Sequence, residues 1–194
     1  MTALQPPAGF IDTPHPPVAG PGRLVSRVEE ITINRPLDEV IAHTETVALA
    51  DWIDRSGALP GVVGTFMLAG DRVDAPGSRH MVFLTDGTTV VEQVLETSRA
   101  GAGYRFRYVV WNYVTAAARP LLYGLGDFQY TDTGDGRTHV RWTYSFELRR
   151  DRFPGFLGPL GGWLLKATFL NGPYAAWMRG SLARTRAIAE GRAA

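Results

Sequence analysis

The chain has 194 residues, 45% of them hydrophobic and 20% charged, which fits one soluble globular domain and excludes a disordered or membrane-embedded chain. Its formal net charge of +1 gives no overall field that would attract nucleic acid, so we expect no nucleic-acid partner. The absence of cysteine excludes disulfides, thiolate nucleophiles and thiolate metal sites, and it suits a cytoplasmic protein.

The first 22 residues are rich in proline and glycine, and they lack the basic segment and long apolar run of a secretory signal. This composition favours extended chain, so we expect a Pro/Gly-rich tail or arm over 1–22 and a single domain over 23–192. Phe10, Ile11 and Val18 could dock on the domain, but a mobile tail is the simpler interpretation.

The first regular elements should be a strand and two short helices. Residues 25–34 are rich in β-branched side chains with a partial period of two, which predicts a strand. A helix should follow directly, with Asn34 or Arg35 at its N-cap and Pro36 at its first helical position. A second short helix is expected over residues 48–55.

Six further strands should follow, because runs of β-branched and aromatic residues alternate with turn residues. They are expected at 62–70, 78–85, 89–96, 103–113, 124–131 and 138–148. Asp86-Gly87 indicates a two-residue primed turn, and residues 133–136 indicate a slightly longer one. The sheet should therefore be mainly antiparallel.

The last of these strands alternates cleanly between apolar and polar side chains. One face carries Val140, Trp142, Tyr144, Phe146 and Leu148, and the other carries polar or charged residues. One face of the sheet should therefore form an apolar interior, and the opposite face should be solvated.

Lys166 is the only charged residue between residues 153 and 178, and this run is long enough to cross a bilayer. Its prolines and glycines would interrupt a spanning helix repeatedly, so we expect a loop followed by a buried helix and no integral membrane span. From Tyr174 onward, apolar residues including Trp177 recur every three or four positions, which predicts an amphipathic terminal helix.

The order of elements and three stretches of sequence resemble the SRPBCC superfamily, which groups START domains, plant pollen allergen-like proteins and polyketide cyclase-dehydrases. The stretches are VEEITINRPLDEVIAHTETVALADWI, DGTTVVEQVLE and GDGRTHVRWTYSFEL. The resemblance covers about residues 25–190, although the tryptophan expected inside the first helix is replaced near Ala42-His43. It implies an α+β helix-grip fold, in which a seven-stranded curved antiparallel sheet wraps around a long C-terminal helix.

Such a fold leaves a cavity between sheet and helix that binds a hydrophobic or aromatic small molecule. Glu92 shares strand parity with Val90 and Val94, so its carboxyl group would be desolvated there and suited to acid or base chemistry. Alternatively, Glu92 pairs with an arginine on a neighbouring strand, such as Arg79, or faces solvent.

The strand over 103–113 should point Tyr108 and Asn112 inward, because Arg105 and Arg107 mark its outer face. With Tyr144, these residues would give an aromatic wall with hydroxyl and amide groups, although they could equally be core. We assign Glu92, Tyr108 and Tyr144 as candidate catalytic residues. The candidate ligand-binding residues are Trp52, His80, Asn112, Trp142, Phe146 and Trp177.

No metal site or cofactor is expected, since the histidines lack ligand spacing and no phosphate loop or dinucleotide fingerprint occurs. His80 could face the cavity, or it could be structural. Lys166 could form a Schiff base if desolvated, but a lysine at a helix edge is simpler. It is the only lysine among 20 basic residues, a bias typical of a GC-rich bacterial genome.

Two functions follow from the resemblance. One is an enzyme of the polyketide cyclase/dehydratase type, and the other is a carrier for a lipid-like ligand without chemistry. Two or more ionisable groups inside the cavity would favour the enzyme, whereas a wholly apolar lining would favour carriage. A weaker third hypothesis is contact with a membrane surface through residues 153–163.

Overall fold

Alternating apolar residues build one antiparallel sheet of seven strands within residues 3–115 and 117–191, the part of the chain that the computed structural model describes. The strand order across the sheet is β1-β7-β6-β5-β4-β3-β2. The strands are β1 (Leu24–Ile33), β2 (Val62–Ala69), β3 (Arg79–Leu84), β4 (Thr89–Ala100), β5 (Gly103–Trp111), β6 (Leu121–Asp132) and β7 (Thr138–Leu148).

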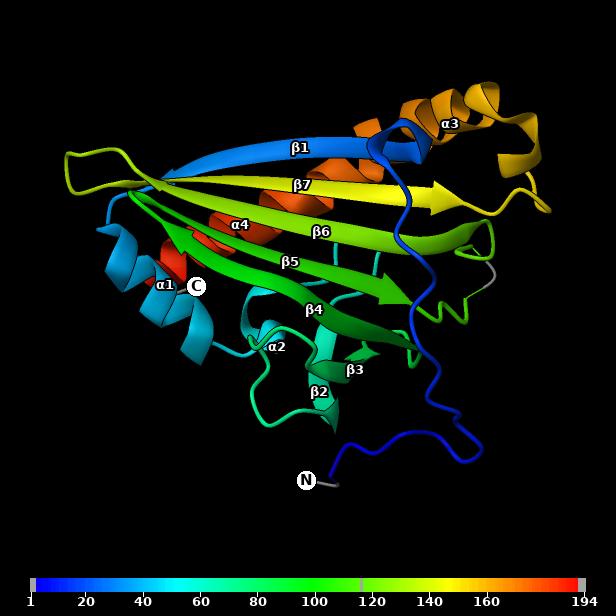
Figure 1. Cartoon of the computed structure of the whole chain (residues 1–194), viewed down its shortest axis with the longest axis horizontal. Helices are drawn as coiled ribbons and strands as arrows, with labels where there is room; N and C mark the ends of the chain where they lie inside the picture. The colour runs from blue at the N-terminus through cyan, green and yellow to red at the C-terminus, as the bar shows by residue number, and fades with distance from the viewer. Residues whose placement is uncertain (1–2, 116, 192–194) are drawn as a thin grey trace.

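The helices lie on the concave side and at the ends of this sheet (Figure 1). Two short helices, α1 (Leu37–Thr46) and α2 (Leu49–Trp52), follow β1, and α4 (Ala175–Ala189) runs across the sheet. The segment before α4 comprises η2 (Gly155–Leu157), α3 (Pro159–Leu165) and the π-helical η3 (Lys166–Tyr174). The expected helix-grip architecture is confirmed.

The inner face of the sheet forms the main core with α4. Trp142 of β7 is fully buried and stacks on Phe128 of β6, with ring centroids 4.7 Å apart. Met178 and Leu182 of α4 belong to the same buried cluster. The alternation predicted for β7 therefore places its apolar side chains in the interior.

Helix α1 begins one residue later than expected. Pro36 is its N-cap, in an extended conformation, and makes no side-chain capping bond. The backbone and side-chain amides of Asn34 instead donate to Glu190 Oε1, at 2.8 and 2.9 Å. Asn34 therefore joins the end of β1 to the end of α4 rather than capping α1.

The expectation of a loop up to Pro173 is wrong beyond Gly158. Pro159 stands at the start of α3, where its missing N–H removes no helical bond. Pro173 lies inside the π-helical segment, whose altered bonding frame accommodates it. The chain is therefore helical from Pro159 to Ala189.

The turn at Asp86-Gly87 is also wider than predicted. The Leu84 backbone N–H donates to Thr88 O and that of Gly87 to Leu84 O, so three residues form the loop. Within this loop only Gly87 has a positive φ, of 79°, whereas a primed turn needs two such residues. The loop suits a turn followed by a glycine bulge.

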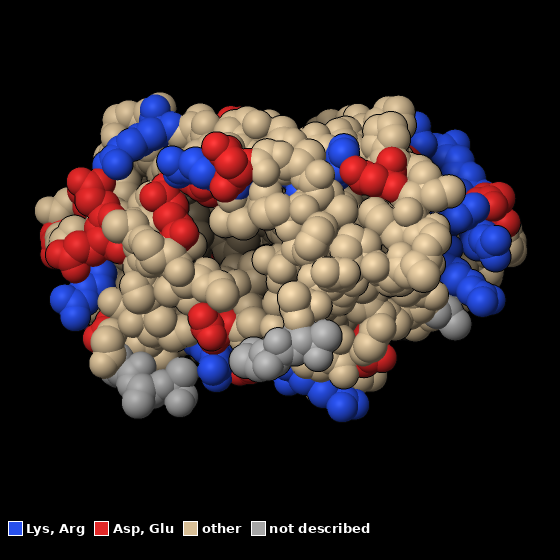
Figure 2. All heavy atoms as spheres, turned by 90° about the horizontal axis from the view of Figure 1, so that it is seen from below, with Lys and Arg blue, Asp and Glu red and all other residues tan. Residues whose placement is uncertain are grey.

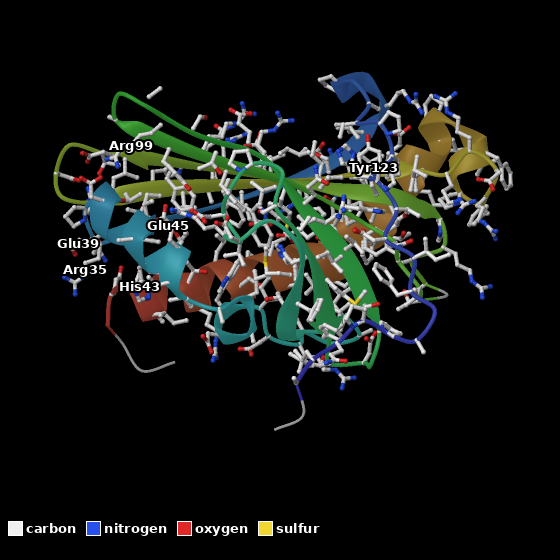
Figure 3. All side chains as sticks on the ribbon, turned by 60° about the horizontal axis from the view of Figure 1, so that its bottom comes forward. Arg35, Glu39, His43, Glu45, Arg99 and Tyr123 are labelled. Atoms are coloured by element: carbon white, nitrogen blue, oxygen red, sulfur yellow. The ribbon has the colours of Figure 1, made fainter. Side chains whose placement is uncertain are left out.

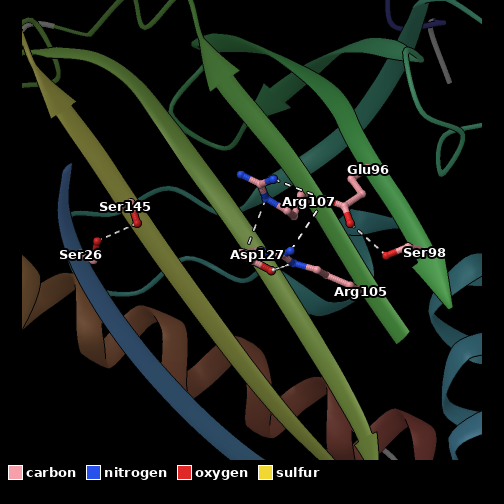
Figure 4. A network of polar contacts seen from close by, with 7 residues as sticks. All are labelled: Ser26, Glu96, Ser98, Arg105, Arg107, Asp127 and Ser145. Atoms are coloured by element: carbon pink, nitrogen blue, oxygen red, sulfur yellow. Dashed lines mark hydrogen bonds and ion pairs between the residues drawn. The ribbon is translucent and has the colours of Figure 1, made fainter. Parts of the chain in front are cut away.

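Part of the outer face carries charged pairs, as expected from Arg105 and Arg107 (Figure 4). Arg105 makes two bonds to Asp127, at 3.0 and 2.6 Å, and Arg107 donates to Glu96 Oε2 at 3.3 Å. The Ser98 hydroxyl bonded to Glu96, together with Arg107, lowers the pKa of that carboxyl group. This half of the outer face is polar.

The other half of the outer face is apolar and lies under the N-terminal segment. Its buried residues are Val91, Val109, Trp111, Tyr123 and Leu125. Phe10 packs against this cluster, His15 meets the Trp111 ring edge-on, and the Ala19 N–H donates to the Tyr123 hydroxyl at 2.7 Å (Figure 3). The N-terminal segment therefore contacts the outer face at Phe10, His15 and Ala19.

Ser145 and Glu147 of β7 are buried, although the outer face of this strand was expected to be solvated. Glu147 is paired with Arg23, and Ser145 Oγ lies 2.8 Å from Ser26 Oγ. Asp12 of the N-terminal segment also pairs with Arg79, at 2.5 Å. The segment thus meets the sheet through charged as well as apolar contacts.

Replacing Phe10→Ala should lower the free energy of unfolding by about 1 to 2 kcal/mol, because its ring leaves the outer apolar cluster. Chemical denaturation measures this loss. Ile11→Ala is the matched control, since Ile11 is exposed and should change stability by less than about 0.5 kcal/mol. Equal effects from both variants would contradict a docked segment.

Candidate functional site

Two cavities lie between the concave face and the helices. Cavity 1, of about 290 Å³, is bounded by the end of α1, by α2 and by the middle strands. Cavity 2, of about 410 Å³, reaches toward η3 and the loop after β5. They share Leu49 and Glu92, so they adjoin there. Figure 2 shows a hollow near the middle of one face, with acidic side chains gathered at one side.

Glu92 faces both cavities and has a histidine partner. Its register partner across β3 and β4 is His80, and the His80 Nε2 to Glu92 Oε1 distance is 3.3 Å. The exposed fractions are 2% for His80 and 9% for Glu92, so both are nearly removed from solvent. Arg79, considered above as the partner of Glu92, pairs with Asp12 instead.

The His80 ring is unusual for a structural histidine. Among the described residues, Nδ1 has no hydrogen-bond partner, and Nε2 faces the Glu92 carboxylate at 3.3 Å without the geometry of a hydrogen bond. A buried imidazole nitrogen left without a hydrogen bond costs free energy, which a structural site normally avoids. Nδ1 is therefore available to a polar group of a ligand in cavity 1.

Four tyrosines line or adjoin the other side of Glu92, around cavity 2: Tyr108, Tyr113, Tyr144 and Tyr174. Burial raises the pKa of each phenol well above its usual value. The Glu92 carboxylate raises the pKa of Tyr108 further. These groups therefore stay protonated at neutral pH and can donate hydrogen bonds to ligand oxygens.

Two glycines of β6 make room for these rings. A Cβ at Gly126 would lie 2.1 Å from Tyr108 Cζ, and one at Gly124 would lie 2.7 Å from the Tyr113 hydroxyl and from the Tyr144 ring. The side chains of Tyr108, Tyr113 and Tyr144 therefore occupy space that a side chain at Gly124 or Gly126 would fill. The pair Gly124-x-Gly126 is the feature of the sequence that could have indicated this wall, although we drew no prediction from it.

Asn112 does not point inward as expected. It has a φ of 64°, lies just after β5 and is exposed, and it does not line either cavity. This left-handed residue reverses the strand parity, so Tyr113 lines cavity 2 although it is an even number of residues from the outward-facing Arg105 and Arg107. Asparagine tolerates this conformation, which sequence parity alone does not reveal.

The other expected residues divide between wall and core. Trp52 lines cavity 1, and Phe146 and Trp177 line cavity 2. Trp142 lies behind the wall, where it packs against Phe128 and Trp52. The chemical roles of all these residues stay predictions.

Several lining residues were not singled out from the sequence. They are Tyr104, Phe128 and Tyr130 in cavity 1 and Tyr113, Phe169 and Tyr174 in cavity 2. Phe169 and Tyr174 belong to η3, where the sequence predicted a loop up to Pro173 and the terminal helix from Tyr174 onward. Lys166 is exposed and lies outside both cavities, so it does not meet the desolvation required for a Schiff base.

Cavity 1 is the more polar of the two. His43 and Glu45 of α1 and Asp74 lie in its wall, and Figure 3 shows His43 and Glu45 on α1 beside Glu39. Within the described ranges, no three or more histidine, aspartate or glutamate residues gather as a metal site. In the same ranges no helix has the length and apolar character needed to cross a membrane.

Comparison with known proteins agrees with the helix-grip fold described above. A family model described as "Polyketide cyclase / dehydrase and lipid transport" matches residues 25–190. No curated protein matches the sequence.

Solved structures share the fold at low sequence identity. The allergen Ara h 8.0201 is 14% identical, with a TM-score of 0.60 over 87% of this chain and 99% of its own. The Zhui aromatase/cyclase from Streptomyces sp. R1128 is 14% identical, with a TM-score of 0.58 over 86% and 94%. The di-domain ARO/CYC StfQ from the steffimycin pathway is 16% identical, with a TM-score of 0.59 over 88% and 52%.

Gly126→Ala should lower the free energy of unfolding by about 1 to 3 kcal/mol, because the new methyl group overlaps the Tyr108 ring. Urea denaturation measures the change. Gly103→Ala on β5 is the control, since its Cβ would meet its nearest atom at 3.4 Å. A neutral Gly126→Ala variant would contradict the close packing of Tyr108.

All seven tyrosines have raised pKa values, with Tyr123 at about 12. Because burial favours the neutral phenol, their contribution to stability is complete below the unfolded pKa of about 10 and is lost as pH rises through the folded values. We expect constant stability from neutral pH to about pH 9 and a steep loss above about pH 10.

Ultraviolet absorption of phenolate checks this expectation. The signal should rise together with alkaline unfolding, whereas urea-unfolded protein should titrate near pH 10. A gradual titration near pH 10 in protein that keeps its near-ultraviolet circular dichroism would show that these phenols are not buried.

Proposed function

This chain belongs to the family of polyketide cyclases, dehydrases and lipid transport proteins, and from that premise we propose that it cyclises and dehydrates a chain rich in carbonyl groups. The ligand would occupy cavities 1 and 2 together, with its reacting carbons beside Glu92. Fold likeness alone does not carry an activity, so the proposal rests on the site.

One observation carries the proposal: ionisable groups converge in an otherwise apolar interior. Glu92 lines both cavities, and His80 Nε2 lies 3.3 Å from Glu92 Oε1. The negative charge of Glu92 also contributes to the raised pKa of Tyr108. Burying such groups is costly, and a carrier for an apolar ligand gains nothing from them. A site that moves protons requires them.

The proposed reaction begins with proton transfer. The Glu92 carboxylate takes a proton from a methylene group between two carbonyls, which leaves an enolate. The enolate carbon attacks a carbonyl carbon further along the same ligand, and the new alkoxide takes a proton from protonated Glu92 or from a phenol. Loss of a second proton and the hydroxyl group as water then forms a carbon–carbon double bond, without any oxidant.

The remaining groups would fold and hold the ligand. The protonated phenols of Tyr108, Tyr113 and Tyr144 donate hydrogen bonds to carbonyl and enolate oxygens, which stabilises the charge that develops there. Phe146, Trp177 and their apolar neighbours keep bulk water from the reactive chain.

The alternative is carriage of a lipid-like ligand without chemistry. The larger, mostly apolar cavity 2 favours it, since an alkyl or isoprenoid chain would fit its wall. Native mass spectrometry of the purified protein, with identification of any retained molecule, separates the two. A retained lipid that the protein leaves unchanged would favour carriage.

The bacterial source and the cytoplasmic location of the protein stay predictions.

Glu92→Gln should lower the rate of ring closure of a synthetic poly-β-ketone thioester by about 10²- to 10⁴-fold, because glutamine cannot accept the methylene proton. Liquid chromatography with mass spectrometry follows loss of water from the substrate. Binding of the substrate should change little, since the amide fills the same volume.

Glu96→Gln is the matched control, because Glu96 lies on the outer face of the same strand. It should leave the rate within about twofold of the unmodified chain. If Glu92→Gln turns over substrate at the unmodified rate while both variants stay folded, the catalytic role of Glu92 is excluded.

A further inference from the structure

An apolar face stands exposed to solvent at one end of the molecule. Phe153, Phe156, Leu160 and Trp163 have exposed fractions between 58% and 64%. The rings of Phe153 and Phe156 lie 6.0 Å apart, and Leu160 and Trp163 share a side of α3 because they are three residues apart. We refer to these four residues as the apolar face.

The backbone beneath this face is tightly packed, so the exposure is not a sign of loose chain. A Cβ at Gly161 would lie 2.0 Å from Pro154 O, and one at Gly155 would lie 2.1 Å from Arg149 O. Gly161 approaches the backbone at Pro154 and Gly155 approaches the backbone at Arg149, so η2 and α3 are packed closely together. Four large apolar side chains are thereby held in solvent at a cost that a partner would remove.

Basic residues precede and follow the apolar face along the chain. They are Arg149, Arg150, Arg152 and Lys166, whereas Asp151, which pairs with Arg149 and Arg152, is the only acidic residue from 149 to 166. Figure 1 places α3 at the end of the molecule opposite the β6–β7 hairpin, and Figure 2 shows basic side chains gathered at that same end. The surface combines exposed aromatic residues with net positive charge.

This surface adjoins cavity 2. Pro154, Leu165 and Phe169 line that cavity from the same segment, and the exposed Val114 lines it from the loop after β5. The Arg149 N–H donates to Pro120 O at 2.8 Å, which holds that loop beside the segment. The apolar face therefore lies next to an edge of cavity 2 that is open to solvent.

We propose that residues 153–166 dock on the surface of a bilayer containing anionic lipids. Aromatic and leucine side chains insert at the boundary between headgroups and acyl chains, and nearby arginines and lysine bind lipid phosphates and carboxylates. Helix α3 is far too short to span, so it lies in the interface.

The charge pattern selects a membrane over a second copy of the chain. A two-fold dimer through this face would bring the same basic residues of both copies together, which is unfavourable. An anionic bilayer complements them. Docking would turn the adjoining edge of cavity 2 toward the lipid. An apolar ligand could then pass between the bilayer and the cavity through this edge without crossing water. The docking itself does not depend on the chemistry proposed for Glu92.

Co-sedimentation of the full chain with vesicles tests the proposal. Binding should be strong to vesicles of phosphatidylcholine with phosphatidylserine and weak to phosphatidylcholine alone. About 1 M salt, which shortens the screening length to about 3 Å, should release most of the bound protein. Subtracting the tryptophan fluorescence spectrum of the Trp163→Phe variant from that of the unmodified chain isolates the emission of Trp163. This emission should shift to shorter wavelength when the protein binds vesicles.

Variants of the surface locate the contact. Phe156→Ser with Trp163→Ser should lower the partition coefficient by roughly tenfold or more. Arg150→Gln with Arg152→Gln should lower binding to anionic vesicles by roughly thirtyfold. The controls are Val63→Ser, another exposed apolar residue, and Arg55→Gln with Arg137→Gln, which remove the same charge elsewhere. The controls should bind like the unmodified chain.

Three results would overturn the proposal. The first is that the unmodified chain does not bind anionic vesicles, and the second is that the surface variants bind as well as the controls. The third is that Phe156→Ser with Trp163→Ser converts a dimer to a monomer in sedimentation velocity while vesicle binding is absent, which assigns the face to a second copy. Each variant is first checked for native circular dichroism.

Discussion

One long helix has to cover a sheet that is much wider than the helix, and this constraint shapes the whole molecule. Seven strands at a spacing of about 4.8 Å span roughly 30 Å, whereas a helix with its side chains is about 10 to 12 Å across. Curvature of the sheet and the short helices α1 and α2 close part of the difference. Aromatic side chains such as Trp142 and Phe128 fill the middle, and the cavities occupy what remains on either side of Glu92.

The same geometry explains where polar groups are tolerated inside. Glu92 lies at the junction of the cavities and His80 lies beside it in the wall of cavity 1, where a ligand can supply the hydrogen bond that His80 lacks. Glycines in β6 let tyrosine rings lie against the backbone, which keeps the space beside Glu92 open. On the outer face, the N-terminal segment covers the apolar half and charged pairs occupy the other half, so both faces of the sheet are accounted for.

The sequence by itself determined the seven strands, the two short helices after the first strand and the terminal helix, together with their order. Side-chain alternation placed β7 and most of β5 with the correct faces inward, since a strand has a period of two that burial on one side enforces. The same parity on β4 and β5 made Glu92 and Tyr108 candidates for the inner face, and Glu92 lines both cavities while Tyr108 lines cavity 2. The resemblance to a superfamily supplied the helix-grip arrangement, and the family match over residues 25–190 agrees with it.

Only the tertiary structure decided which inward side chains meet. The proximity of His80 and Glu92 depends on the register between β3 and β4. The inward position of Tyr113 depends on the left-handed conformation of Asn112. Neither arrangement follows from the pattern of residues along one strand. The helical course of residues 159–173 was hidden because prolines and glycines usually end helices, whereas the observed π-helical segment accommodates Pro173. Core and cavity wall have the same composition, so only packing in three dimensions separates Trp142 from Phe146.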